Sequence, residues 1–408
     1  MISTRSARTL LLGPTLAALA VYGAWAYPAV FQRGLTISKS GVQPGYVVFA
    51  APDGNSYAID VAGKVAGKWP SPEANTGTDY TRPLANGNLL ARIKTKEKRT
   101  APAVGHAVVE FTQAGREVWR YAPTDRHIHH DQEREENGNT LVVCSREFDR
   151  PAISKRLLSD DCLVEVDPSG KVVWDWQTAD HYDELELSSE AKAEIMEGYP
   201  VRAGTPPPAI GMDYLHMNAA SPIPASAGPT DPRFRAGNII VSYRYINTIA
   251  VVDHASKKIV WKMTGVTVGQ HNPNFIPAGM PGTGHILVFD NGNIDMNTNP
   301  THSGSRPNSR VLEINPLDNS IVWEYTADKS NSPIWSFFSH YISSAQRLPN
   351  GNTLICEGAN GRFFEVKPDG EIVWEFVNPF GNMTPKVPDY TVFRVAKAPE
   401  TWLKSGVR

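Results

Sequence analysis

Short runs of alternating apolar and polar residues follow one another along most of the chain, bounded by Gly, Pro, Asn or Asp. One pattern recurs: an apolar run, a turn, and a second run that carries a tryptophan, as in LVEVDPSGKVVW ending at Trp174. A period of two between turn residues predicts antiparallel hairpins. The same slot holds tryptophan in six copies: Trp69, Trp119, Trp174, Trp261, Trp323 and Trp374. The pattern therefore predicts six similar β units.

A second repeated element precedes each tryptophan hairpin. A glycine turn opens an apolar strand, as in NGNTLVVC from Asn137 and NGNTLIC from Asn350, and most copies have a further strand before the turn. Units of about 40–60 residues with four antiparallel strands are typical of propeller blades around a channel. We therefore expect an all-β, six-bladed β-propeller over residues 36–408. The stretch Tyr390–Val395 is expected to pair beside Gly45–Ala50 and close the ring.

The N-terminus has a different composition. Leu10–Phe31 contains no charged residue, and arginines lie on both sides of it. Such a stretch is long enough to span a bilayer and exceeds the roughly 7–15 apolar residues of a signal peptide. Ala24-Trp25-Ala26 matches a cleavage pattern, so removal stays open. Residues 1–35 are expected to be a signal-anchor or signal peptide with a short linker. Both interpretations export the rest of the chain to the periplasm or another extracytoplasmic location, and the anchor would tether it to the inner membrane.

Charge and cysteine content narrow the functional classes. Lys and Arg total 40 against 42 Asp and Glu, without the clustered basic excess of a nucleic-acid-binding protein. Three cysteines are too few for a disulfide framework. Cys144 and Cys162 flank one predicted hairpin and could pair in an oxidising compartment. The alternative is that they and Cys356 are buried free thiols.

Histidines recur at the start of the predicted innermost strands. His129 and His130 begin this strand in blade three, and three later blades follow with His216, His271 and His340. In a propeller these starts converge on one end of the channel. A lone histidine is more often structural, but the same slot filled in four adjacent blades indicates a functional cluster.

The antiparallel path returns further polar residues to the same end of the channel. Ends of second strands and starts of third strands carry Arg146, Arg244, Asn291, Arg310 and Arg362. Guanidinium groups bind the oxygens of an oxyanion in a bidentate manner. The mouth is therefore predicted to bind an oxyanion, with His130, Arg244, Asn291 and Arg362 as substrate ligands.

Four motifs, taken in order, resemble the bacterial aryl-sulfate sulfotransferases. They are DYLHMNAA (Asp213–Ala220), GQHNPNF with ILVFDNG (Gly269–Gly292), SRVLEINP (Ser309–Pro316) and AQRLPNGNTLICEG (Ala345–Gly358). The resemblance covers about residues 41–395. It implies a six-bladed propeller that moves a sulfuryl group from a phenolic sulfate donor to an acceptor phenol. Members of this family use neither a cofactor nor the nucleotide sulfate donor of the cytosolic enzymes.

The resemblance also implies a catalytic group of three histidines and one arginine, in which one histidine is transiently sulfurylated. By motif, His216 and His271 match two of the histidines and Arg310 matches the arginine. His340, ahead of the last glycine hairpin, is the best match for the nucleophile.

Three other interpretations stay open. His129, His130 and Asp131 could be metal ligands, although no H-E-x-x-H or comparable spacing is present. The outer-strand tryptophans also occur in quinone-dependent dehydrogenases, which usually have eight blades and an acidic calcium site. A non-catalytic envelope scaffold would need no convergent histidines and arginines. Packing between blades is the simplest role for the tryptophans.

Overall fold

The computed structural model describes residues 32–74, 76–98, 104–198, 211–225, 230–293, 304–382 and 388–403. The propeller is one compact unit that begins at Gly34. The apolar stretch Leu10–Phe31 lies outside the described residues. Within the described ranges, no helix has the length and apolar character needed to cross a membrane.

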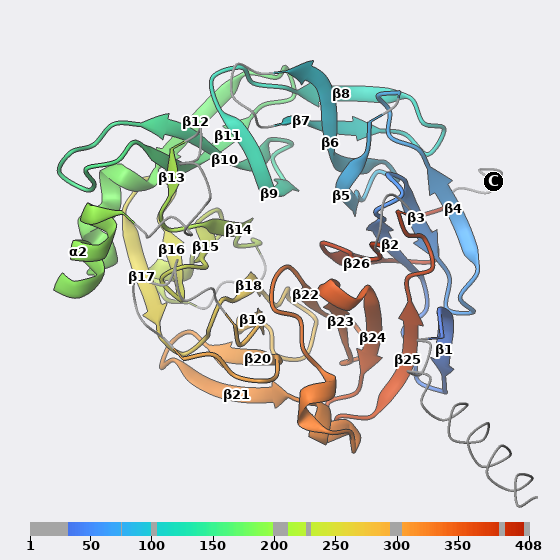
Figure 1. The fold of residues 1–408 in the computed structure, drawn as a ribbon. Helices are drawn as coiled ribbons and strands as arrows, with labels where there is room; N and C mark the ends of the chain where they lie inside the picture. The colour runs from blue at the N-terminus through green and yellow to red at the C-terminus, as the bar shows by residue number, and fades with distance from the viewer. Residues whose placement is uncertain are drawn as a thin grey trace, which may run out of the picture. The chain divides into compact units, whose positions relative to one another are not determined.

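The described strands form six sheets arranged as blades around one axis, as predicted (Figure 1). From the axis outward, blade 1 contains β26 (Val395–Ala398), β2 (Tyr46–Ala50), β3 (Ser56–Ile59) and β4 (Val65–Trp69). Blade 2 contains β5 (Thr78–Pro83), β6 (Leu89–Lys98), β7 (Val104–Phe111) and β8 (Glu117–Tyr121). Blade 3 contains β9 (His127–Arg134), β10 (Thr140–Phe148), β11 (Leu158–Val166) and β12 (Val172–Gln177).

The remaining blades follow the same order. Blade 4 contains β14 (Met217–Pro222), β15 (Ile239–Tyr243), β16 (Thr248–Val252) and β17 (Ile259–Thr264). Blade 5 contains β18 (His271–Phe275), β19 (Ile286–Asp290), β20 (Arg310–Asn315) and β21 (Ser320–Tyr325). Blade 6 contains β22 (Ser344–Arg347), β23 (Thr353–Glu357), β24 (Arg362–Val366) and β25 (Ile372–Val377). Between blades 3 and 4 lie η1 (Thr178–Leu185), α2 (Ser189–Glu197) and β13 (Met212–Asp213).

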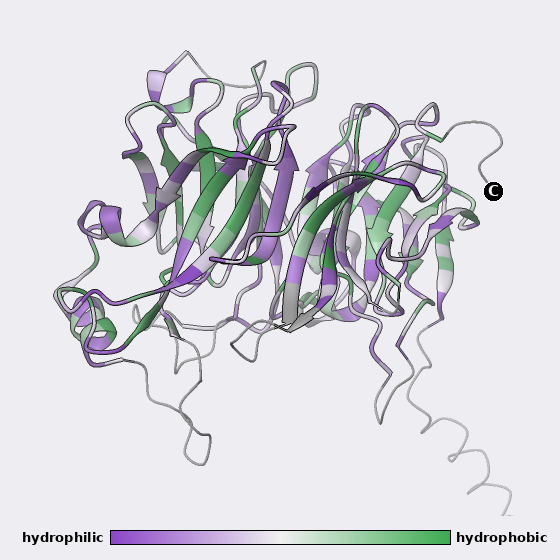
Figure 2. Cartoon of the chain, turned by 90° about the horizontal axis from the view of Figure 1, so that it is seen from above, coloured by the Kyte–Doolittle hydropathy of each residue, from purple (hydrophilic) through white to green (hydrophobic). Residues whose placement is uncertain are grey.

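The six tryptophans all lie in outer strands, so the predicted slot is confirmed. Five of the indole N–H groups donate to a carbonyl of the next blade, and these pairs are Trp69–Gln113, Trp119–Asp167, Trp174–His254, Trp323–Pro368 and Trp374–Val61. An apolar cluster fills each of the six interfaces between neighbouring blades. Figure 2 shows this apolar material concentrated in the strands. The tryptophans therefore join neighbouring blades.

The two ends of the propeller differ in detail from the prediction. The strand beside β2 is Val395–Ala398, with Phe49 opposite Val395, so it begins where the predicted strand Tyr390–Val395 ends. The displacement has a physical reason: Arg394 directs its side chain into the channel, where it pairs with Asp131. The segment before Val395 is thus used for channel contacts instead of sheet pairing.

An additional strand covers the outer edge of blade 6. β1 (Gly34–Ser38) pairs antiparallel with β25, and Thr36 donates from Oγ1 to Glu375 Oε1 at 2.7 Å. The covered Val373 is fully buried, whereas its counterparts Val118 and Val173 in uncovered outer strands are 45% and 50% exposed. The start of β1 had been predicted as linker, because its short run carries no repeat signature.

Cys144 and Cys162 lie opposite each other in β10 and β11. Both are buried free thiols, and so is Cys356. The structure agrees with the alternative of three unpaired cysteines.

Candidate active site

The inner strands are irregular at the end of the channel where the histidines gather. Register shifts interrupt the pairing of β9, β14 and β18. Beside these shifts, His130, His216 and Asn272 have positive φ angles of 54°, 58° and 52°. This backbone region costs non-glycine residues roughly 1–3 kcal/mol and persists where surrounding contacts enforce it, often at functional sites. The irregularity recurs in three adjacent blades and sets the local path of the mouth residues.

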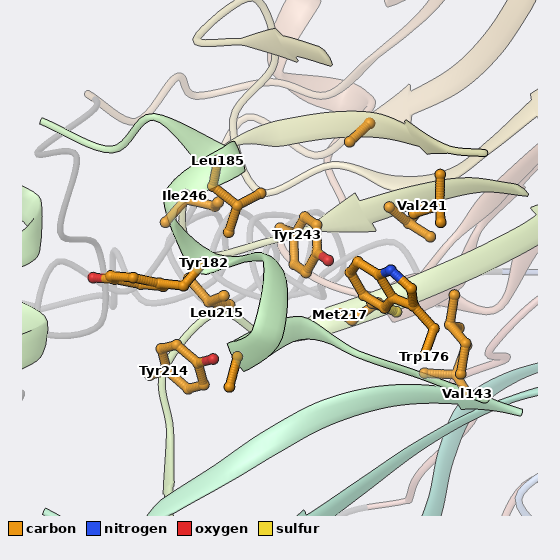
Figure 3. Close-up of a cluster of buried hydrophobic side chains, with 14 of the residues drawn as sticks. Val143, Trp176, Tyr182, Leu185, Tyr214, Leu215, Met217, Val241, Tyr243 and Ile246 are labelled. Atoms are coloured by element: carbon orange, nitrogen blue, oxygen red, sulfur yellow. The ribbon is translucent and has the colours of Figure 1, made fainter. Parts of the chain in front are cut away.

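His216 is held by a carboxylate from its own segment. Its Nδ1 lies 2.5 Å from Asp213 Oδ2. The flanking residues Tyr214, Leu215 and Met217 are fully buried in the core between blades 3 and 4, which Figure 3 shows. Burial acts to raise the pKa of Asp213, but His216 and His129 together outweigh burial, and the pKa is lowered. When Nδ1–H donates to Asp213, His216 Nε2 is left for proton transfer.

His129 and His130 form a second pair beside His216. Their Nδ1 atoms are 2.7 Å apart, and His129 Nε2 lies 3.2 Å from Asp161 Oδ1. The His130 ring stands 4.6 Å from the His216 ring at an interplanar angle of 80°. Burial lowers the pKa of His129 to about 4 and that of His130 well below its usual range. Both imidazoles are therefore neutral near pH 7.

His340 lies at the rim. It is exposed and occupies the loop four residues before β22, whereas it had been predicted at the start of the inner strand. Its backbone carbonyl accepts a hydrogen bond of 3.4 Å from Arg244 Nη2. Partial burial, together with the positive charge of Arg244, lowers the pKa of His340. The neutral ring is thus favoured next to a guanidinium.

His271 lies beneath this loop and supports it. Its Nδ1 is 2.7 Å from Asn291 Oδ1, and its Nε2 accepts a 3.1 Å hydrogen bond from the Ile342 N–H. Asn291 Nδ2 donates to the carbonyls of Ser339 and Ile342. His271 is only 2% exposed, and burial holds its pKa well below the usual range. His271 and Asn291 therefore position the segment that carries His340.

Arg310 and Arg362 are engaged elsewhere. Arg310 donates from Nε to Asp290, from Nη1 to Glu324 and from Nη2 to the Val266 carbonyl. Arg362 pairs with Glu357 and Glu375. In the part of the chain that the structure describes, neither arginine contacts a mouth histidine. The structure brings His130, His216, Arg244 and His340 to one region, with Asn291 and His271 below, but not these two arginines. Their predicted contacts with substrate remain untested predictions.

Three residues that had not been predicted lie around His130 and His216. Tyr245 stacks on His216 with centroids 4.7 Å apart at 18°. Phe393 lies 5.9 Å from the His130 ring, and the guanidinium of Arg92 lies 5.2 Å from Phe393. The aromatic residues had no motif to identify them, because they reach the mouth through tertiary structure. The one available signal for Arg92 was a charged residue within an apolar strand.

The structure also bears on the alternative that His129, His130 and Asp131 bind a metal ion. Asp131 is paired with Arg394. Over the described ranges, no group of three or more His, Cys, Asp or Glu side chains is arranged to hold a metal ion.

Comparisons with known proteins add a family and a fold. The model of the arylsulfotransferase (ASST) family matches residues 100–379. A protein of unknown function from Bacteroides caccae is similar in structure, with a TM-score of 0.52 and 13% identity over 86% of this chain and 98% of that chain. A virginiamycin B lyase from Staphylococcus aureus has a TM-score of 0.37 and 10% identity over 85% and 89% of the two chains. No curated protein matches the sequence.

Proposed function

Because the chain belongs to the arylsulfotransferase family, we propose that it moves a sulfuryl group from a phenolic sulfate ester to an acceptor phenol. One observation carries this proposal: two imidazoles and a guanidinium converge on a mouth that also has aromatic walls. His130 and His216 supply the imidazoles, and Arg244 approaches His340. Tyr245 offers a face suited to the aryl ring. The apolar stretch Leu10–Phe31 favours activity outside the cytoplasm.

In the first half-reaction, a lone pair of the neutral His340 imidazole attacks sulfur. An N–S bond forms, and the S–O bond to the donor phenol breaks. His216 in its protonated form, stabilised by Asp213, gives its Nε2 proton to the leaving phenolate. The enzyme is left with sulfurylated His340 and neutral His216. One difficult displacement is thereby divided into two easier ones.

In the second half-reaction, the acceptor phenol takes the place of the departed phenol. Neutral His216 removes its proton, the phenol oxygen attacks sulfur, and the N–S bond breaks. Arg244 stabilises negative charge near the transferred group, and a well-placed donor of this kind contributes about 3–4 kcal/mol. His271 and Asn291 keep the His340 loop in place through Ile342 and Ser339.

The test is reaction with 4-nitrophenyl sulfate alone, followed by mass spectrometry. Wild-type protein should release nitrophenol in a burst equal to the enzyme concentration and carry a sulfuryl group on the peptide containing His340. His340→Asn should lose both. His216→Asn should still be sulfurylated but turn over roughly 100-fold or more slowly, the usual size of general acid–base contributions. His285→Asn is the control, because that histidine bonds Glu313 away from the mouth.

The outcomes separate the assignments. A sulfuryl group that persists on His216 in the His340→Asn protein would move the nucleophile to His216. A wild-type protein that neither becomes sulfurylated nor sulfates a phenol would contradict the proposal and favour the scaffold.

A further inference from the structure

We propose that Arg92 is a second cation, in addition to Arg244, that binds the sulfuryl oxygens, an assignment that rests on the proposed transfer reaction. Arg92 lies in β6 of blade 2, ahead of residues 100–379 that the family model matches.

Arg92 is a buried charge that forms no ion pair with the described residues. Arg92 is 7% exposed. Its Nε and Nη1 atoms have no hydrogen-bond partner among the described residues. A buried charge without compensation destabilises the folded state. A guanidinium presents parallel N–H groups that match two oxygens of an oxyanion. Arg92 therefore retains the donors that a sulfuryl group requires.

Nearby carboxylates are already taken. Asp79 lies 2.9 Å from His106 Nε2 and 3.1 Å from Lys94 Nζ. Asp131 is paired with Arg394, whose Nη2 also donates to the Asn218 carbonyl. These carboxylates favour the charged form of Arg92 at longer range, although burial lowers its pKa. An anion that enters from solution would therefore meet a guanidinium that neither of these carboxylates binds directly.

Arg92 lies near two of the mouth histidines, His129 and His130. Its guanidinium lies over the Phe393 ring, which in turn borders His130. Burial is the main cause of the lowered pKa values of His129 and His130, and the positive charge of Arg92 contributes to both. A sulfuryl group held by Arg92 would face neutral imidazoles that do not compete for its oxygens. Its negative charge persists through both half-reactions, so Arg92 would hold it while the phenols exchange.

The experiment uses the full chain with Arg92→Gln and Arg92→Lys. Arg120→Gln is the control, since Arg120 pairs with Glu117 on the surface of the same blade. Binding of inorganic sulfate is measured by calorimetry, and kcat and KM are measured with 4-nitrophenyl sulfate. We expect Arg92→Gln to lose sulfate binding and to lower kcat/KM by roughly 100-fold or more. Arg92→Lys, or added guanidinium ion, should restore part of the loss.

Thermal unfolding separates a binding role from a structural one. Removing an unpaired buried charge should leave the melting temperature without sulfate unchanged or higher, and abolish the rise that sulfate produces in wild type. A lower melting temperature in both variants, or wild-type sulfate affinity and kcat/KM in Arg92→Gln, would overturn the assignment. The wild-type protein could bind sulfate through Arg92 and yet transfer no sulfuryl group. That result would support the anion site at Arg92 and refute the proposed function.

Discussion

The histidines that the sequence places at the start of successive inner strands differ in their ability to exchange a proton in the folded protein. His216 has Nδ1 bound to Asp213, which leaves Nε2 for chemistry. His271 has both ring nitrogens engaged, by Asn291 and Ile342, and so acts on the His340 loop. His340 itself is exposed at the rim. The pattern could predict that these histidines converge, but hydrogen bonding decides which one can exchange a proton.

Burial of His129 predicts a pH dependence of stability. Its pKa falls from the ordinary 6.5 to about 4 on folding. Between these values the unfolded chain binds the proton and the folded protein does not, so stability decreases as pH falls, by about 1.4 kcal/mol per pH unit. His129→Gln should remove this slope between about pH 6.5 and 4. Urea unfolding at pH 7, 6 and 5 measures it, and an unchanged slope relative to wild type would contradict the prediction.

The contacts of the arginines could not be predicted from the sequence. Arg310 fits a family motif, yet its three donor nitrogens are occupied by Asp290, Glu324 and a carbonyl. Arg92 belongs to no motif, yet it is buried with unpartnered nitrogens near the histidines. A motif identifies a position along a strand, whereas the partners of a guanidinium depend on which blades meet around it.

At the level of strands, the tryptophan repeat predicted the six blades because all six copies lie in outer strands, and five of them make the same contact with the next blade. The indole joins an outer strand to the turn between the third and fourth strands of the next blade. For example, Trp374 donates to the Val61 carbonyl at 3.0 Å. β1 escaped prediction because it adds a fifth strand to one blade only. Repetition made the shared strands visible, and a strand present once carries no such signal.

This contact predicts an energetic difference between two outer-strand tryptophans. Trp374 and Trp261 are 1% and 6% exposed, but no bond from Trp261 to the next blade is seen in the described part of the chain. Phenylalanine removes the indole N–H from both and leaves similar cavities. Trp374→Phe should therefore cost about 1 kcal/mol more than Trp261→Phe, the net contribution of one buried hydrogen bond. Urea unfolding compares the two, and equal losses would show that the bond contributes nothing.

At the scale of the whole molecule, one buried ion pair joins blades across the channel. Arg394, just before β26, pairs through Nη1 with Asp131 Oδ2 at 2.5 Å, and through Nη2 with the Asn218 carbonyl of blade 4. Both charged residues are at most 2% exposed. Arg394 also lines a cavity of about 190 Å³ with Tyr80 and Glu133. Arg394 thus joins the C-terminal segment to blade 3 through Asp131 and to blade 4 through Asn218.

Removing both partners of this pair should cost much less stability than the two single removals added together. Asp131→Leu would leave the Arg394 charge buried and uncompensated, at a cost of about 3–5 kcal/mol, and Arg394→Leu would do the same to Asp131. The double variant leaves no buried charge, so its loss should be well below the sum of the single losses. Urea unfolding of the four proteins gives the coupling energy by difference. Strictly additive losses would mean that Asp131 and Arg394 have no coupling energy. The C-terminal segment would then be joined to blade 1 by the contacts between β26 and β2 alone.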